Sequence, residues 1–314
     1  MSSKRLITST SVLDEAESLW WEKFSDVEEK FCWVQPPEVN TFLRKKYLNK
    51  IINLLPNEGT VLELGCGSGW LCLQLGRLRV NHVVGMDFSE EQISKAKTRA
   101  RESNLQHKIE FKKQTADELK NSKNAFDIVI VHAFLHHLSV EEIKEVFSAA
   151  HRLMKSGGRL VLFEPIQYPA QGEDTKTRVI RKFAQKLITG LSSSTFLNFC
   201  KRSSSELKVR GLLEERNVGV PPFGASPKEI PFQPDELENL IAPFFTIREK
   251  FRCLAFSYFV AQENLLMELS YPRFARLVRW PLLTGARFVE QQLLSLKSPP
   301  PDFWIFEMFI CDLK

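Results

Sequence analysis

The sequence predicts a doubly wound α/β fold, and three observations point to it. Short, nearly continuous apolar runs recur along the middle of the chain, as in parallel strands that are buried on both faces. Helical patterns separate these runs, and a glycine-rich turn follows the first of them. Strands that alternate with helices build a sheet that carries helices on both of its faces.

The apolar runs give the expected strands in chain order. Four are clear and one is weaker, and they cover Val61–Leu64, Val83–Met86, Ile109–Lys112 (the weaker one), Phe126–Val131 and Leu160–Phe163. Two helices begin with the pattern of a capping box, Ser89 with Gln92 and Ser139 with Glu142. Gly157 and Gly158 are expected to end the second helix, because glycine adopts the left-handed conformation of a helix C-cap.

Four segments are expected along the 314 residues. They are a helical N-terminal cap (1–55) with a helix at 41–55, a Rossmann-like core (56–165), an inserted helical lid (166–232) and a C-terminal part that completes the sheet (233–314). The last part should hold a helix at 234–241, a strand within 244–259 and a strand at 303–311. Between these strands lies a helical insertion near 262–299, which Pro272 and Pro281 are expected to break.

Composition narrows the class of protein. With 43% hydrophobic and 26% charged residues, the chain is an ordinary globular protein. The net charge of +5 comes without a Lys/Arg block, which argues against a nucleic-acid partner. The N-terminus lacks the pattern of a signal peptide, and no stretch approaches the ~20 apolar residues of a membrane span, so a cytoplasmic location is expected. The six scattered cysteines suggest reduced core residues, and no His/Cys spacing suggests a metal.

The glycine-rich turn is the strongest functional signal. Glu63-Leu-Gly65-Cys66-Gly67-Ser-Gly69 directly follows a predicted strand. Glycines let the backbone approach a ligand closely, and the helix that follows offers free N–H groups. The dinucleotide fingerprint G-x-G-x-x-G would need a glycine at position 70, where Trp70 stands. The turn therefore indicates a nucleotide-type pocket that differs from a nicotinamide site.

Asp87 is the second element of this pocket. It lies at the expected end of the second strand, where a carboxylate can accept hydrogen bonds from both ribose hydroxyls. Phe88 beside it could pack against a purine face. The structural alternative for Asp87 is a carboxylate that only caps a helix.

Together these segments resemble the class I S-adenosylmethionine-dependent methyltransferases. The resemblance rests on the glycine turn, Asp87, Thr115-Ala116-Asp117, the strand 126–131 and the segment 153–158. Phe134-Leu-His136-His137-Leu138 is most similar to the small-molecule branch, which includes quinone-biosynthesis methyltransferases. The resemblance covers residues 55–165 well and implies a mostly parallel, seven-stranded, Rossmann-like sheet with S-adenosyl-L-methionine as the cofactor.

The resemblance also implies roles for individual residues. Glu63, Gly65, Cys66 and Gly67 are expected around the methionine part of the cofactor, and Asp87 and Phe88 around the adenosine. Ala116 is expected beside the adenine ring and Asp117 at its amino group, although a plain surface acid is the alternative for Asp117. The backbone near His132 is expected at the sulfonium end.

Candidate general bases follow two strands of the predicted sheet. His136 and His137 come after the fourth strand, and Glu164 ends the fifth. A base helps when the methyl acceptor is a hydroxyl, a phenol or an acidic carbon, and histidine titrates near neutral pH. The alternatives are that a histidine only shapes its loop and that Glu164 only orients a neighbour.

The methyl acceptor should bind in the less well matched segments. Their aromatic residues suggest a lipophilic or aromatic small molecule, and they are Trp20, Trp21, Phe183, Phe196, Phe199, Phe223, Phe274 and Trp280. The alternative is that about half of these residues only pack the lid onto the core. The run from Arg273 to Trp280 mixes basic and apolar residues as a membrane-surface helix would, although a solvated amphipathic helix is the commoner explanation.

Other functions stay open from sequence alone. A nicotinamide-dependent oxidoreductase is disfavoured by Trp70 and Glu63, and a non-catalytic binding module by the joint presence of Glu63, the glycines and Asp87. A protein acceptor is not excluded. Methylation of nucleic-acid amino groups is disfavoured, because His132-Ala-Phe-Leu135 stands where an Asn/Asp-Pro-Pro-Tyr motif would be expected.

Overall fold

The computed structural model describes residues 15–17, 37–114, 125–168, 179, 228, 230–254, 257, 260–261, 264, 272–295 and 305–314. Several sequence predictions lie outside these residues. They are most of the expected helical cap before residue 37, with Trp20 and Trp21, the segment Thr115–Asp117 and most of the inserted lid at 166–232. The four expected segment boundaries stay predictions.

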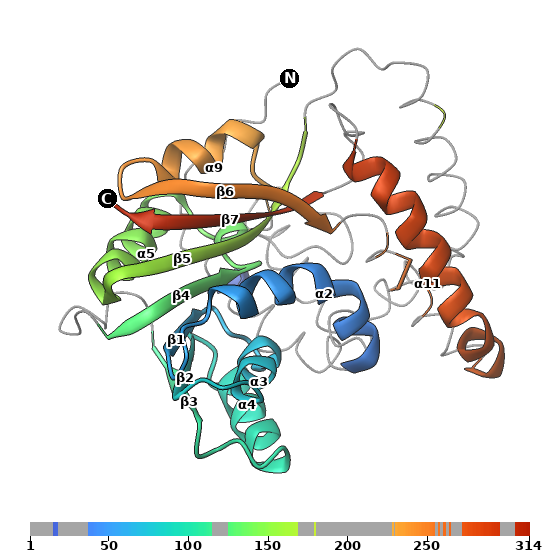
Figure 1. The fold of residues 1–314 in the computed structure, drawn as a ribbon, viewed down its shortest axis with the longest axis horizontal. Coiled ribbons are helices and arrows are strands. Elements are labelled where there is room, and N and C mark those ends of the chain that lie inside the picture. Colours follow the sequence, from blue (N-terminus) through green and yellow to red (C-terminus); the bar gives the residue numbers. More distant parts are fainter. Residues whose placement is uncertain are drawn as a thin grey trace.

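A seven-stranded sheet forms the centre of the molecule, with strand order β3-β2-β1-β4-β5-β7-β6 (Figure 1). The strands are β1 (Thr60–Leu64), β2 (His82–Asp87), β3 (Ile109–Lys113), β4 (Phe126–His132), β5 (Met154–Ile166), β6 (Phe245–Leu254) and β7 (Ile305–Leu313). The first five run parallel, while β7 pairs antiparallel with both β5 and β6. The prediction of a doubly wound, mostly parallel seven-stranded sheet is confirmed.

Helices cover both faces of this sheet, and each face has its own apolar core. The helices are α2 (Pro37–Leu54), α3 (Trp70–Gly76), α4 (Glu90–Glu102), the 3₁₀ turn η2 (Leu135–His137), α5 (Val140–Leu153), α9 (Pro234–Ile241) and α11 (Pro272–Leu294). Side chains of α2, α3, α4 and α11 pack on one face, and those of α5 and α9 on the other. Consecutive strand residues such as Val161 and Leu162 point into opposite cores, because successive side chains of a strand alternate between the two faces of the sheet.

Both predicted helix starts are present. The Ser139 side chain accepts from the Glu142 N–H while the Glu142 carboxylate accepts from the Ser139 N–H, which completes a capping box. At the start of α4, the Ser89 side chain accepts from the Gln92 N–H, which is the first of the two hydrogen bonds of a capping box. Because the orphan N–H groups of a helix start are satisfied locally, these positions were readable from the sequence.

The prediction that Gly157 and Gly158 cap α5 is wrong. The helix ends at Leu153, and Met154 already has an extended backbone with ψ of 141°. Met154 is buried and pairs with Phe126, so strand β5 begins at once. Gly157, with φ of 76°, instead lies in the irregular start of β5, where the pairing with β4 shifts its register between Phe126 and Ile128.

Two further expectations change in the C-terminal part. Pro272 begins α11, but Pro281 lies inside that helix and does not break it. Pro281 is exposed, so the carbonyl that loses its helical partner one turn earlier can be hydrated. Within the expected strand region 244–259, β6 ends at Leu254, and residues 257, 260 and 261 are helical. None of the described helices is long and apolar enough to cross a bilayer.

Candidate active site

The glycine turn lies between β1 and α3, at the carboxyl edge of the sheet. Gly65, Gly67 and Gly69 all have positive φ, at 69°, 50° and 80°. A side chain on Gly65 would clash with the Phe134 ring, which would lie 2.4 Å from its Cβ, so this glycine is needed for packing. A Cβ on Gly67 would meet only the Gln92 amide oxygen at 4.0 Å. Gly67 therefore leaves an open backbone surface on which a ligand can lie.

Asp87 joins this turn to the end of β2. Its carboxylate accepts from the N–H groups of Gly67 at 2.8 Å and Ser89 at 2.9 Å. Burial raises the pKa of the Asp87 carboxyl, and the backbone hydrogen bonds oppose that rise. The prediction that Asp87 ends the second strand is confirmed, and from there its carboxylate holds the glycine turn in shape. Its role toward a ribose stays a prediction.

Glu63 is buried beneath the turn. One of its carboxyl oxygens accepts from the Cys72 N–H at 3.1 Å and from the Cys72 thiol at 2.9 Å, at the first turn of α3. Burial raises the pKa of Glu63 to about 8, and it raises the pKa of the neighbouring Cys66 thiol to about 11. Both groups are thus favoured in their protonated forms at neutral pH, and Cys66 is a core thiol rather than a nucleophile.

Three features of this edge fit a bound cofactor of the expected kind. The Gly67 backbone is open, and Phe88 at the end of β2 leaves 39% of its surface exposed, which suits stacking on a flat ring. The indole N–H of Trp70 is buried and has no hydrogen-bond partner in the structure, as expected of a donor that a ligand or a water satisfies. The expected adenine contacts, Ala116 and Asp117, lie outside the described residues.

His132 ends β4, the strand beside β1, and its ring centroid lies 6.4 Å from that of Trp70. Its Nε2 lies 2.8 Å from an Arg44 guanidinium nitrogen and 3.2 Å from the Tyr47 hydroxyl. Burial and the Arg44 charge hold the pKa of His132 well below its usual value, so the ring is neutral. The Arg44 guanidinium also lies over the Trp70 ring, 4.7 Å from its centroid. Helix α2 thus places a buried cation next to the glycine turn.

His136 and His137 each meet a carboxylate through Nδ1. His136 Nδ1 lies 2.7 Å from the fully buried Glu164, whose other oxygen accepts from the Phe134 and Leu135 N–H groups. His137 Nδ1 lies 3.1 Å from Glu17, and the centroids of the two imidazole rings are 4.0 Å apart, with the ring planes tilted by 41°. A carboxylate at Nδ1 fixes the orientation of the ring and stabilises its protonated form. The structure therefore brings together all three candidate bases that the sequence singled out.

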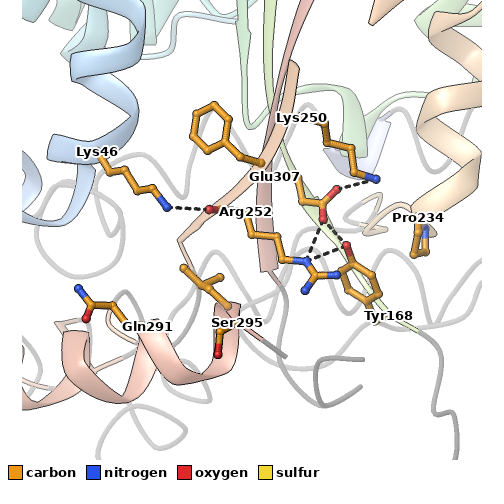
Figure 2. Close-up of a pocket in the computed structure, with 10 residues that line it drawn as sticks. Lys46, Tyr168, Pro234, Lys250, Arg252, Gln291, Ser295 and Glu307 are labelled. Carbon is orange, nitrogen blue, oxygen red and sulfur yellow. Dashed lines mark hydrogen bonds and ion pairs between the residues drawn. The ribbon is translucent and has the colours of Figure 1, made fainter. Parts of the chain in front are cut away.

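A cavity of about 580 Å³ opens beyond this cluster, at the β5–β7–β6 end of the sheet (Figure 2). Its walls come from α2, the end of β5, α9, β6, α11 and β7, and the residues are Lys46, Tyr168, Pro234, Lys250, Phe251, Arg252, Gln291, Leu294, Ser295 and Glu307. None of the glycine-turn residues lines it. The cavity is therefore separate from the expected cofactor position.

Glu307 links the cavity to the histidine cluster. It is fully buried and accepts hydrogen bonds from the Tyr168 hydroxyl and from Arg252, with Lys250 3.4 Å away (Figure 2). Strand pairing places Glu307 directly opposite Glu164. Two buried carboxylates thus lie side by side on neighbouring strands, one holding His136 and the other the cavity wall.

Sequence reasoning missed several residues of this region. Arg44 and Tyr47 lie on α2, and Glu17, Arg252 and Glu307 come from both ends of the chain. A buried arginine within a helical pattern carries no motif that could have identified it. Glu307 offered a weak signal, as a single acidic residue within the apolar strand 303–311.

Residues 61–158 match a family model described as a methyltransferase domain. Ubiquinone biosynthesis O-methyltransferases are among the relatives. The one from Nitrosomonas europaea is 31% identical over 140 residues, which cover 44% of this chain and 54% of that protein. The one from Bartonella tribocorum is 32% identical over 108 residues, which cover 34% and 42%. The sterol 24-C-methyltransferase of Aspergillus fumigatus is 28% identical over 167 residues, which cover 51% and 43%. The chain spans about half the length of the curated relatives it matches.

Solved structures support the fold. The [4+2]-cyclase SpnF superposes with a TM-score of 0.54 at 16% identity, covering 98% of this chain and 97% of that chain. A phosphoethanolamine N-methyltransferase of Haemonchus contortus, solved with S-adenosylhomocysteine, gives a TM-score of 0.52 at 13% identity, covering 94% and 59%. Because one of these proteins is named as a cyclase, the fold alone does not decide the reaction. The family match, the glycine turn after β1 and the strand order together identify residues 61–158 as a methyltransferase domain of class I, whose cofactor is S-adenosyl-L-methionine.

Proposed function

We propose that this chain transfers the methyl group of S-adenosyl-L-methionine to a small lipophilic or aromatic acceptor. One observation carries the proposal: the glycine turn and the His132–His137 segment face each other where β1 and β4 part. This is the point at which the strand order reverses and where ligands bind in open α/β sheets. The Phe134 ring packs against Gly65 and holds the two segments together.

The cofactor would lie along the carboxyl edge, with the ribose at Asp87 and the methionine part between the glycine turn and α2. Arg44 is our candidate partner for the methionine carboxylate, because a buried guanidinium beside an open backbone surface is suited to bind a carboxylate. Glu63, Gly65, Cys66 and Gly67 would form the floor under the methionine part. The substitution Arg44→Gln should weaken cofactor binding about tenfold or more in calorimetry, and unchanged affinity would remove Arg44 from this role.

Methyl transfer requires the protein to position the acceptor, to exclude water and, for some acceptors, to remove a proton. The cofactor supplies a sulfonium methyl whose leaving group departs neutral, so the protein needs no acid for it. The chain must hold the acceptor atom about 3 Å from the methyl carbon and in line with the C–S bond, and it must exclude water. The Glu164–His136 pair could take the acceptor's proton, because the carboxylate stabilises the imidazolium that forms.

The acceptor would occupy the space between this pair and the cavity of Figure 2. Phe251 and Leu294 give the cavity an apolar wall, while Tyr168 and Arg252 offer polar contacts. A site of this composition suits a largely apolar molecule with a polar group. The names of the relatives support this class, because ubiquinone biosynthesis and sterol methylation both involve lipophilic molecules.

Labelled cofactor tests the proposal. The purified chain is incubated with methyl-labelled S-adenosyl-L-methionine and a lipid-soluble metabolite extract, with the Asp87→Ala variant as the blank. We expect label in a small organic-soluble product that the variant fails to form. Label in protein would identify a protein methyltransferase instead. Cofactor binding without any labelled product, across lipid-soluble and water-soluble extracts, would identify a non-catalytic binding module.

A further inference from the structure

Helix α11 carries an apolar face that points away from the protein. Four large side chains on it are exposed, Phe274 (56%), Leu277 (75%), Trp280 (43%) and Phe288 (66%). The spacing from Phe274 to Leu277, Pro281 and Phe288 is three, seven and fourteen residues, which places them on one side of a helix. Trp280, three residues from Leu277, borders the same side, and its ring also packs edge-on against Phe42 of α2 with the centroids 5.6 Å apart.

The opposite side of α11 already packs on the protein. Ala275, Leu283 and Ala286 are buried, and the buried Glu290 accepts from the Ser257 N–H at 2.9 Å. A helix at a protein surface normally turns apolar residues inward and polar residues outward. Since α11 is apolar on both sides, the solvated amphipathic helix that was the commoner explanation for this run does not describe it.

The charges of α11 have one sign at the surface. The helix contains four arginines, and its one acidic residue, Glu290, is buried. Arg273 and Arg276 are exposed beside the apolar face, while Arg287 donates to the backbone carbonyls of Phe42 and Leu43. Exposed arginines next to aromatic and aliphatic side chains are typical of helices that lie in the interface of an anionic membrane.

We propose that α11 docks this protein on the surface of an anionic lipid bilayer. Phe274, Leu277, Trp280 and Phe288 would enter the boundary between headgroups and acyl chains, with Arg273 and Arg276 at the phosphates. Charge complementarity favours lipid over an apolar protein groove, because the flanking charges are cationic and the helix exposes no acid. The contact is peripheral, since α11 cannot span a bilayer.

The same helix reaches the cavity of Figure 2. Gln291, Leu294 and Ser295, at the C-terminal end of α11, line that cavity. The proposed lipid contact and the cavity therefore lie on the same helix, which would bring a membrane-bound acceptor close to the cavity. This access route rests on the proposed function, whereas the lipid contact itself does not.

Vesicle flotation of the full chain tests the lipid contact without any activity measurement. We expect the protein to float with vesicles of phosphatidylcholine mixed with phosphatidylglycerol, and to remain behind with phosphatidylcholine alone. The double substitution Leu277→Ser with Phe288→Ser should lower the partition coefficient about tenfold or more, because it removes two inserted side chains. Ile52→Ser, at an exposed apolar side chain on α2, is the matched control and should float like the wild type.

A second pair of variants tests the charges. Arg273→Gln with Arg276→Gln should reduce binding to anionic vesicles and weaken its dependence on salt, because fewer phosphate contacts form. Lys97→Gln with Arg101→Gln, two exposed cations on α4, should leave binding unchanged. Circular dichroism and cofactor affinity confirm that each variant is folded.

Either of two outcomes would overturn the proposal: a wild type that fails to float with anionic vesicles, or α11 variants that float as well as the wild type does. In the first case, light scattering can in addition show a dimer that the Leu277→Ser and Phe288→Ser pair dissociates. That result would assign the face to a second copy of the chain.

Discussion

The two halves of the carboxyl edge are built in different ways. Around the glycine turn, contacts join residues that are close in sequence, and a backbone N–H donates in most of them. Asp87 and Gly67 are 20 positions apart, and Glu63 and Cys72 are nine. Around the histidine cluster and the cavity, side chains bind side chains from distant segments. Arg44 and His132 are 88 positions apart, and Tyr168 and Glu307 are 139.

This difference separates contacts that many sequences could form from contacts that need particular side chains. A backbone N–H exists at every residue except proline, so the glycine turn needs only glycines and one or two carboxylates to form. A side-chain pair requires two particular residues to meet, and it can change without disturbing the sheet. We therefore infer that the β1–β2 half specifies the methyl donor and the β5–β7–β6 half the acceptor.

The largest expected effect is a loss of stability when a side chain is added within the glycine turn. Gly65→Ala should lower the free energy of unfolding by about 2–5 kcal/mol, from positive-φ strain of about 1–2 and overpacking against Phe134 of about 1–3. Gly157→Ala is the matched control, because its φ of 76° is also positive but nothing lies within 4 Å of the added Cβ. Urea denaturation should show a loss of only about 1–2 kcal/mol there. Equal losses would mean that the Phe134 contact contributes nothing.

The next effect tests whether Asp87 serves the donor. Asp87→Ala should lower S-adenosyl-L-methionine affinity tenfold or more in calorimetry, since each charge-assisted hydrogen bond contributes about 1.5–3 kcal/mol. Asp127→Ala is the control, because Asp127 also accepts from a backbone N–H, that of Thr60, but at the amino end of β4. It should leave the affinity unchanged. If both variants lose similar affinity for the cofactor, Asp87 has a structural role and does not bind the cofactor directly.

The third effect separates the two adjacent carboxylates of the acceptor half. Glu164→Gln should lower kcat about tenfold and alter its pH profile, because the carboxylate that supports the His136 imidazolium is lost. Glu307→Gln should act mainly on the KM for the acceptor, because Glu307 holds Tyr168 and Arg252 in the cavity wall. Cofactor affinity should stay near normal in both. A Glu164 variant with normal kcat and an unchanged pH profile would show that no base acts through His136.

The smallest effect, counted per pH unit, concerns the pH dependence of stability in the glycine-turn half. Glu63 has a pKa near 8 in the folded chain against 4.5 ordinarily, so between these values the folded state binds more protons than the unfolded one. The contribution of Glu63 to stability is therefore fully present below this window and is lost as pH rises through it, with a slope of at most about 1.4 kcal/mol per pH unit. Glu63→Gln should flatten that slope in urea titrations across the window. A slope identical to the wild type would show that Glu63 is ionised in the folded chain.

The prediction from sequence was strongest where local patterns decide the structure. Ser139 and Glu142 cap α5 as expected, because both partners of a capping box lie within one turn. The prediction failed where the surroundings in the folded chain decide the structure. Gly157 did not cap the helix, because the pairing of Met154 with Phe126 begins β5 first. Pro281 did not break α11, because its exposed position leaves the affected carbonyl open to water.

The sequence by itself determined the alternation of strands and helices, the glycine turn and the position of Asp87, because each depends on residue types at short and regular spacing. Its resemblance to the class I methyltransferases supplied the seven-stranded sheet and the methyl donor. Only the tertiary structure brought Arg44 to His132, joined Glu164 to His136 and set Glu307 beside Glu164. It also decided which side of α11 faces outward. Contacts of this kind depend on how distant elements pack, and no local pattern in the chain encodes them.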